Sequence, residues 1–369
     1  MYALLFADSG MSGGQISLLF GIWSLTGFVL EVPSGALADR VPRRHLLVVA
    51  EVIRALGFAC WLLWPTFTGF ALGFVLWGVN GALSSGTWEA LVYDELTRLG
   101  AADRYARILG RCEALAATGT LAGTALAGPL LALGGYRAAG WASVAACLLC
   151  AALTTRLPAG SPLDADADAD SDVDADEPGD GYFATLRAGV TEAVRNRAVG
   201  LLVASVVVLS GATAIEEYFS LLAVGLTSVA ALPYLLLVPE LAYALGAEAG
   251  GRLAGLAPRW VAGLAGAGAI VLAAGALIRH PAGFVLLSVG YGALGAAIVV
   301  ASARLQDTLT GPRATVTSVS AIGEEVVALI VYAVFGAASG AVSLPVLCAL
   351  AALPVVVLAL RLPRWLPRA

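Results

Sequence analysis

Six acidic residues stand inside long apolar stretches of the sequence, where a charge is costly to bury. They are Glu31, Glu89, Asp94, Glu240, Glu324 and Glu325. A carboxyl group in such surroundings must be protonated, hydrated or paired. Binding and releasing a proton is the chemistry to expect from them, so we take the six as candidates for proton coupling. In the alternative interpretation, each one pairs with a hydroxyl or amide of a neighbouring helix, or lines a water-filled vestibule.

Two further acids, Glu216 and Glu217, are adjacent in the sequence. Glu324 and Glu325, among the six candidates, are adjacent as well. Consecutive positions on an α-helix point about 100° apart. We therefore expect only one member of each adjacent pair to face a given cavity. Glu51 and Arg54 are three positions apart within one apolar run, and we expect them to neutralise each other.

The composition supplies an apolar scaffold for these acids. Of the 369 residues, 59% are apolar and 13% are charged, against about 45–50% and about 25% in soluble domains. This excludes a soluble enzyme, a nucleic-acid binder and a disordered scaffold, and the long continuous runs do not fit β-barrel strands. The runs suffice for eleven helices of about 20 residues each, so we expect an all-α polytopic membrane protein. The predicted spans are residues 16–36, 45–64, 70–92, 113–133, 138–156, 198–222, 229–250, 260–278, 283–304, 315–338 and 343–362.

Histidine and cysteine give no sign of a metal or catalytic centre. The two histidines, His45 and His280, are far apart, and Cys147 and Cys150 lie three positions apart in an apolar run. Small apolar packing explains that cysteine pair better than metal binding does. We therefore expect no metal, no cofactor and no enzymatic activity.

Aromatic residues within the spans could form the walls of an apolar substrate cavity. Aromatic side chains in membrane helices also serve as packing and interface anchors, which is the alternative interpretation. The candidates for cavity walls are Trp23, Trp77, Trp88, Tyr218 and Tyr291.

The placement of the basic residues predicts the orientation in the membrane. All 21 are arginines, which together with abundant alanine and glycine suggests a GC-rich bacterial coding sequence. Eighteen follow alternate spans or lie in the C-terminal tail, Arg54 lies within a span, and only Arg137 and Arg279 lie in the opposite loops. By the positive-inside rule the arginine-rich side is cytoplasmic. We expect a multi-pass protein of the bacterial inner membrane with a cytoplasmic C-terminus and a cytoplasmic central linker.

An acidic segment divides the chain in the middle. Nine acids fall between Asp164 and Asp180, most of them at alternate positions. Such a segment stays hydrated and flexible, and it lacks the glycine and glutamate offsets of a calcium-binding loop. An amphipathic interfacial helix could follow over residues 182–197. We predict an N-terminal helix bundle over residues 1–157, the linker and interfacial helix over 158–197, and a C-terminal bundle over 198–369.

The two bundles share an internal repeat. The segment Gly35–Arg44 aligns with Gly251–Trp260, with glycine, leucine, alanine, proline and arginine matching at five positions. A weaker match pairs Tyr93–Thr97 with Gln306–Thr310. Two halves of about six helices, related by a parallel repeat and joined by a long loop, are typical of transporters.

The segment Gly35–Arg44 resembles the signature loop between helices 2 and 3 of the major facilitator superfamily. That pattern reads glycine, any residue, leucine, alanine, aspartate, arginine, any residue, glycine, arginine, and arginine or lysine; Pro42 is the single departure. The resemblance implies two six-helix halves and makes the eleven spans helices 2 to 12. Helix 1 is then largely missing, because residues 1–8 are too short to cross a bilayer. Either the start codon is assigned too late or the natural protein is truncated.

The resemblance also implies a conformational latch at the cytoplasmic face. Its residues are Gly35, Asp39, Arg40, Arg43 and Arg44. A carboxylate at Asp39 would cap the positive end of helix 11, at about 0.3–2 kcal/mol. In the second half Gly255 replaces the aspartate and Leu256 the first arginine, so we expect a one-sided latch. In the alternative interpretation the arginines only fix the topology.

Other stretches resemble bacterial drug exporters of the same superfamily. Helix 5 carries part of their glycine-proline motif, at Gly119, Gly123, Gly128 and Pro129, whereas the arginine that many of them carry in helix 4 is absent. We therefore expect a monomeric secondary transporter in the lipid bilayer that exports a small apolar or amphipathic molecule against protons, without a nucleic-acid partner. The alternatives are an uptake porter of the same superfamily and a truncated, non-transporting remnant.

Overall fold

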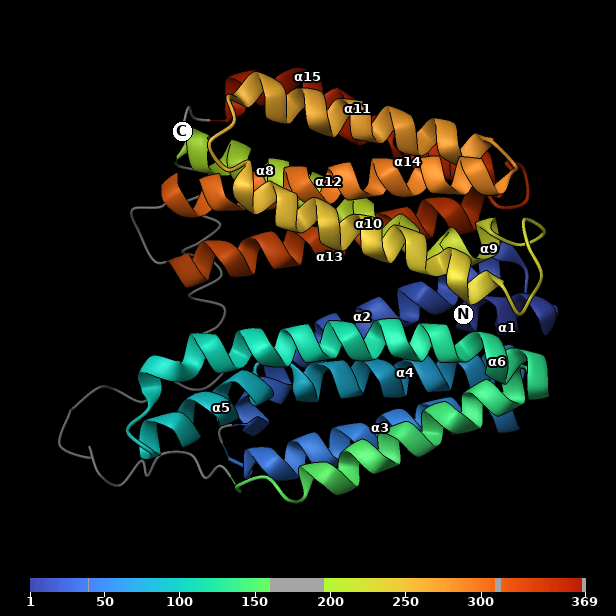
Figure 1. Cartoon of the computed structure of the whole chain (residues 1–369), viewed down its shortest axis with the longest axis vertical. Coiled ribbons are helices and arrows are strands. Elements are labelled where there is room, and N and C mark those ends of the chain that lie inside the picture. The colour runs from blue at the N-terminus through green and yellow to red at the C-terminus, as the bar shows by residue number, and fades with distance from the viewer. Residues whose placement is uncertain (39, 160–195, 309–312, 367–369) are drawn as a thin grey trace. The chain divides into compact units, whose positions relative to one another are not determined.

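The computed structural model describes residues 1–38, 40–159, 196–308 and 313–366, and within these ranges the chain is helical without strands (Figure 1). The first group of α-helices is α1 (Tyr2–Asp8), α2 (Gly13–Ala38), α3 (Arg43–Leu63), α4 (Phe67–Ser84), α5 (Thr87–Arg98) and α6 (Tyr105–Thr154). The second group is α8 (Arg197–Gly211), α9 (Phe219–Leu222), α10 (Leu232–Arg252), α11 (Pro258–Leu277), α12 (Pro281–Thr308), α13 (Arg313–Ala338), α14 (Leu344–Ala351) and α15 (Leu353–Trp365). Two 3₁₀ segments, η1 (Ala102–Arg104) and η2 (Ala212–Tyr218), complete the order.

Helix occupies each of the eleven predicted spans, which confirms the all-α class. By length and composition, nine helical stretches of the described residues could cross a membrane. One of the nine, Ala102–Thr154, covers two predicted spans, which meet at the non-helical residues Gly134 and Gly135, and α10 lies outside the nine. The predicted acidic linker and interfacial helix lie outside the described residues, apart from the ends of that segment.

The span predicted over residues 70–92 lies within the helical stretch Phe67–Arg98, and that stretch contains a break. Helix α4 ends at Ser84 and α5 begins at Thr87, with Gly86 between them at a φ of 69°. This left-handed backbone suits glycine, since a Cβ there is strained. The break leaves Glu89 in the first turn of α5.

The described chain divides into two compact units. One unit comprises Leu19–Tyr182, and the other comprises Met1–Leu18 together with Phe183–Ala369. The first turns of the chain therefore pack with the C-terminal helices, α1 lying against α9. The domain boundaries proposed from the sequence stay predictions.

An aromatic cluster forms the core of the unit Leu19–Tyr182. The rings of Trp61, Phe74 and Trp77 pack within about 5–6 Å of one another, and Trp23 stacks on Phe74. The indole of Trp61 donates a hydrogen bond to the Phe70 carbonyl at 3.1 Å. Two of the predicted cavity-wall residues, Trp23 and Trp77, thus take part in packing between helices α2, α3 and α4.

The other unit has its core around α12. Helix α12 packs between α10 and α11, and glycines allow the close approach, because a Cβ at Gly246 would overlap the carbonyl group of Gly292. Tyr218, another predicted wall residue, is 2% exposed and hydrogen-bonds the Ser17 hydroxyl at 2.8 Å while its ring lies on Phe335. It is a core residue of this unit.

Candidate functional site

A cavity of about 200 Å³ lies within the unit formed by Met1–Leu18 and the C-terminal helices. Three glutamates contribute to its wall, two from η2 and one from α10. The lining residues are Met1, Tyr2, Glu216, Glu217, Phe219, Ser220, Leu236, Pro239, Glu240 and Tyr291. No arginine is among them.

The adjacent acids Glu216 and Glu217 both line this cavity, so the expectation that only one of them could do so was wrong. The segment that carries them is the 3₁₀ helix η2 rather than an α-helix. The two carboxylates diverge towards opposite walls: Glu216 accepts a hydrogen bond from the Tyr291 hydroxyl of α12, and Glu217 accepts one from the Tyr2 hydroxyl of α1. A cavity bounded by both walls therefore receives both side chains.

Glu240 reaches the cavity from α10, where it directly follows the buried Pro239. Proline within a helix has no N–H, so the carbonyl one turn earlier loses its usual partner. Glu240 is exposed to the cavity, and within the described residues no hydrogen bond or ion pair engages its carboxylate. Of the three acids it is the one without a phenolic donor.

The charge of this cavity needs balance from protons or a cation. Three carboxylates share a small space with tyrosine, phenylalanine, leucine and proline side chains. Like charges this close, in surroundings of low polarity, cannot all stay ionised without a counter-charge. Tyr2 and Tyr291 stabilise the ionised form of Glu217 and Glu216 by donating to them. Glu240 has no such donor, so its carboxylate lacks the hydrogen bond that each of the other two receives.

The other predicted acids lie elsewhere. Glu31, on α2, and Glu89, on α5, belong to the unit Leu19–Tyr182; Glu31 is exposed, and one buried oxygen of Glu89 has no hydrogen-bond partner. Glu324 lies on α13 beside the Ser210 hydroxyl of α8, and Glu325 is its half-buried neighbour. The expected pair of Glu51 and Arg54 is confirmed, with 3.1 Å between oxygen and nitrogen.

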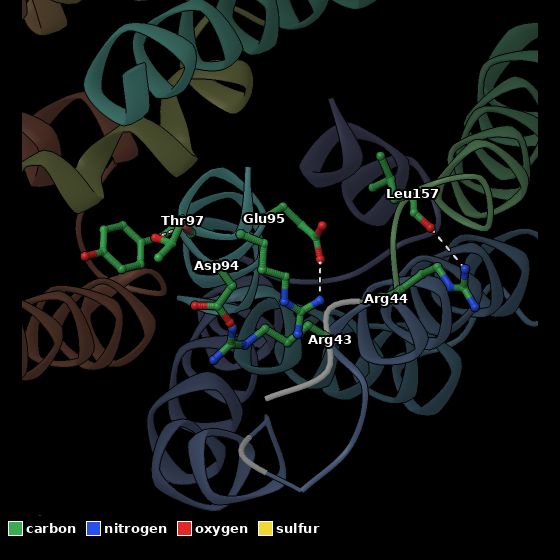
Figure 2. A network of polar contacts seen from close by, with 8 residues as sticks. Arg43, Arg44, Asp94, Glu95, Thr97 and Leu157 are labelled. Carbon is green, nitrogen blue, oxygen red and sulfur yellow. Dashed lines mark hydrogen bonds and ion pairs between the residues drawn. The ribbon is translucent and has the colours of Figure 1, made fainter. Parts of the chain in front are cut away.

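Two of the predicted latch residues, Arg43 and Arg44, lie in the first turn of α3 (Figure 2). Arg43 forms an ion pair with Asp94 of α5, and the two side chains are 15% and 8% exposed. Arg44 donates to the Leu157 carbonyl at 3.0 Å, beyond the end of α6. Gly35 and Arg40 are exposed, and Asp39 lies outside the described residues.

This ion pair changes the interpretation of Asp94. We had grouped it with the proton-coupling candidates, but its charge is balanced by a guanidinium at the start of α3 (Figure 2). An arginine at a helix N-terminus meets an unfavourable dipole, whereas a carboxylate there is favoured. Asp94 therefore compensates both the arginine and the helix end. The sequence spacing could not show this, because the contact joins residues 51 positions apart.

In the C-terminal half, a different arginine, Arg304 of α12, holds the repeated loop in place. It is 4% exposed, and its guanidinium donates to the carbonyls of Ala254, at 3.0 Å, and Leu256. Arg304 is the last residue of the predicted span 283–304; in the structure it lies within α12, which ends at Thr308, and it fixes the α10–α11 connection. Arg259, which aligns with Arg43, lies over the Trp260 ring at 5.6 Å.

The helix 5 motif lies on α6. Gly119 and Gly123 are exposed with open space around them, Gly128 is buried, and Pro129 stands inside the helix. Trp88, on α5, is half-buried. Among the predicted wall residues, Tyr291 alone lines the acidic cavity.

The helical fold, the apolar spans and a buried acidic cavity define a polytopic membrane transporter. The sequence matches the model of the Major Facilitator Superfamily over residues 1–342, and the chain belongs to that family. Among solved structures, the nucleoside transporter NupG is similar with a TM-score of 0.73 and 14% identity, over 98% of this chain and 93% of that one. A point mutant of NupG gives 0.74 and 15% with the same coverage. The comparison with curated protein sequences finds no match.

Proposed function

We propose that this chain is a proton-coupled transporter that exports a small apolar or amphipathic molecule, and that Glu240 carries the exchangeable proton. The observation that supports this is the cavity that gathers Glu216, Glu217 and Glu240 without a basic side chain in its wall. Glu31 and Glu240 are both exposed side chains, but Glu240 shares a cavity with two other acids, and this favours it among the six candidates.

The proton cycle follows from the partners of the three acids. Glu216 and Glu217 each accept a hydrogen bond from a tyrosine hydroxyl. A hydrogen bond donated to a carboxylate favours its ionised form. A third negative charge next to them is unfavourable. Glu240 would therefore bind a proton when the cavity is closed to water, and release it when the cavity opens to a side of low proton concentration. Coupling that release to an access change drives a substrate the other way.

Export rather than uptake rests on the sequence. The helix 5 glycines and proline resemble those of exporters, and Asn80 and a few acids are the amide and charged groups at mid-depth in the predicted spans, fewer than a polar nutrient needs. NupG shares the fold at 14% identity, which does not carry its substrate to this chain. We keep nucleoside uptake as the competing outcome of the experiment.

The first test measures the protonation of a carboxyl group and needs no substrate. Infrared difference spectra of the purified protein, recorded as the pH is lowered, should contain a band from a carboxyl that becomes protonated. Glu240→Gln should remove most of that band. Glu248→Gln is the matched control, because it lies two helical turns further along α10 in an exposed pair with Arg252. An unchanged band in Glu240→Gln would exclude Glu240 as the proton carrier.

The second test reads transport in inverted membrane vesicles. With a proton gradient, the wild type should accumulate the amphipathic dye ethidium, while Glu240→Gln should permit exchange but not accumulation against a gradient. Uridine is the probe for the alternative. Uridine movement with no ethidium movement would replace export by nucleoside transport. Movement of neither probe, together with no titrating carboxyl, would favour the non-transporting remnant.

Orientation in the bilayer is part of the proposal and has its own experiment. Single cysteines at Thr66 and Ser339, in the cysteine-free background, should react with a membrane-impermeant maleimide from outside. A cysteine at Ala167, in the acidic linker, should react only after permeabilisation. Labelling of Ala167 from outside would invert the assigned orientation and place the latch on the outer face.

A further inference from the structure

A second cavity, of about 180 Å³, lies in the same unit at one end of its helices. Residues around the ends of α9 and α11 meet there with the starts of α12 and α14. Its apolar wall includes Leu221, Leu226, Ile278 and Phe284, and Arg279 is the charged residue in the lining. An apolar pocket with one guanidinium at the level of the helix ends is amphipathic, like the boundary between headgroups and acyl chains.

The contacts of the Arg279 side chain do not indicate a role in stabilising the fold. It lies in the connection between α11, which ends at Leu277, and α12, which begins at Pro281, and it is exposed. Within the described residues no carboxylate or carbonyl pairs with its guanidinium. It is also one of two arginines, with Arg137, in loops on the arginine-poor side. The topology signal therefore does not account for a cation at this place.

The start of α14 adds an unsatisfied polar edge to the pocket. Ser343 is the N-cap, but its hydroxyl makes no capping hydrogen bond, and it lines the pocket together with Leu344. The start of α12 differs, because the Ala282 N–H is already bonded to the His280 ring at 3.1 Å. A hydroxyl, an uncapped helix start and a guanidinium on one side of an apolar wall favour an anion that has an apolar part.

We infer that this pocket binds an anionic phospholipid, with the phosphate group at Arg279 and Ser343 and the first part of an acyl chain against Leu221, Leu226 and Phe284. The volume equals about six water-sized groups, at about 30 Å³ each. A cavity of this volume accommodates a phosphate group and a few methylenes, and the rest of the lipid would extend into the bilayer. A free phosphate ion would use the guanidinium but would gain nothing from the apolar wall.

The site is separate from the acidic cavity, although the two are neighbours in the chain. Phe219 and Ser220 line the acidic cavity, and the next residues, Leu221 and Leu222, line this pocket. The lining sets share no residue. The lipid proposal can therefore be tested by binding alone, and it stands or falls independently of proton coupling.

Native mass spectrometry of the full chain, purified in detergent and titrated with phosphatidylglycerol or phosphatidylcholine, tests the proposal. The wild type should retain phosphatidylglycerol in preference to phosphatidylcholine. Arg279→Gln should weaken phosphatidylglycerol binding about tenfold, the scale of one charge-assisted hydrogen bond. Ser343→Ala should weaken it about threefold, the scale of one neutral hydrogen bond. Unchanged thermal unfolding of both variants would show that the loss is one of binding.

Arg137→Gln is the matched control, since it removes the other arginine of the arginine-poor loops and lies in the other unit. It should leave lipid binding unchanged. An equal loss in both arginine variants would show general charge attraction and overturn the site. Displacement of the lipid by millimolar inorganic phosphate would overturn it too, because the pocket would then be an ion site without a role for its apolar wall.

Discussion

The signature loop and its repeat in the second half are held by different chemistry. At the first loop, Arg43 of α3 pairs with the Asp94 carboxylate of α5. At the second, Arg304 of α12 donates to the backbone carbonyls of Ala254 and Leu256. Both loops are thus held by an arginine, but at positions that do not align in the repeat, and the acceptor is a side chain in the first loop and the main chain in the second.

This difference between the two contacts indicates which of the two loops can change its partners. A side-chain ion pair can exchange partners when helices shift, since both ends are mobile and charged. In a contact with main-chain carbonyls, by contrast, only the arginine side chain can move unless the backbone shifts as well. Two of the helices concerned differ in the same sense: α5, which carries Asp94, is separated from α4 by a break at Gly86, while α12, which carries Arg304, is continuous over its 28 residues. We infer that the first loop is the switching one and the second is a fixed support.

The largest expected effect comes from breaking the ion pair. Arg43→Ala leaves the Asp94 carboxylate, 8% exposed, without its partner, and should lower the free energy of unfolding by about 3 kcal/mol. Arg98→Ala, in the more exposed pair with Glu95, should cost less than about 1 kcal/mol.

The coupling can be measured in a double-mutant cycle. Thermal unfolding in detergent of Arg43→Ala, Asp94→Ala and the double variant should show a double variant more stable than the sum of the single losses predicts. Additive losses would mean that the two charges do not interact, and the first loop would then lose its distinction from the second.

The second largest loss of stability is expected from replacing Arg304, which holds the repeated loop in the second half. Arg304→Met keeps the length and apolar stem of the side chain but removes both donors, so it should cost about 2 kcal/mol. Amide hydrogen exchange should rise in the residues 253–257. Arg252→Met, which breaks an exposed pair on α10, is the control and should change stability by less than about 0.5 kcal/mol. Faster exchange throughout this unit would indicate a role in the whole core rather than in one loop.

Local rules of sequence predicted the helices and the contact within one helix turn, and missed what depends on distant partners. The pair of Glu51 and Arg54 followed from spacing alone. The joint exposure of Glu216 and Glu217 to one cavity did not, because the tyrosines that bind the two carboxylates come from distant segments of the chain. Helix α12 runs to Thr308, past the predicted end at Arg304, because helix ends predicted from sequence are uncertain by a few residues. The tyrosine partners on α1 and α12 could not be found, since nothing in the sequence links positions 75 or more apart.

Asp39 tests whether the first loop alone switches. Asp39→Asn removes the charge that we expect to hold a helix start, a contact of about 0.3–2 kcal/mol, so ethidium export in vesicles should fall several-fold at equal expression. Gly255→Asp places the missing acid in the repeated loop, where a Cβ meets open space, and should leave export unchanged. Near-normal export by Asp39→Asn would reduce the signature to a topology signal, and a loss in Gly255→Asp would make both loops mobile.

The smallest effect concerns the break between α4 and α5. Gly86→Ala puts a Cβ on a left-handed backbone and should lower the free energy of unfolding by about 1 kcal/mol. Gly81→Ala lies five positions earlier, inside α4, where a Cβ also meets open space, and should raise it by about 0.5–1 kcal/mol because alanine favours a helix. The same chemical change should therefore have opposite signs in unfolding measured by circular dichroism. Stabilisation by both substitutions would show that the first-half helix can run straight through Gly86, as α12 does, and would remove the break as a difference between the two halves.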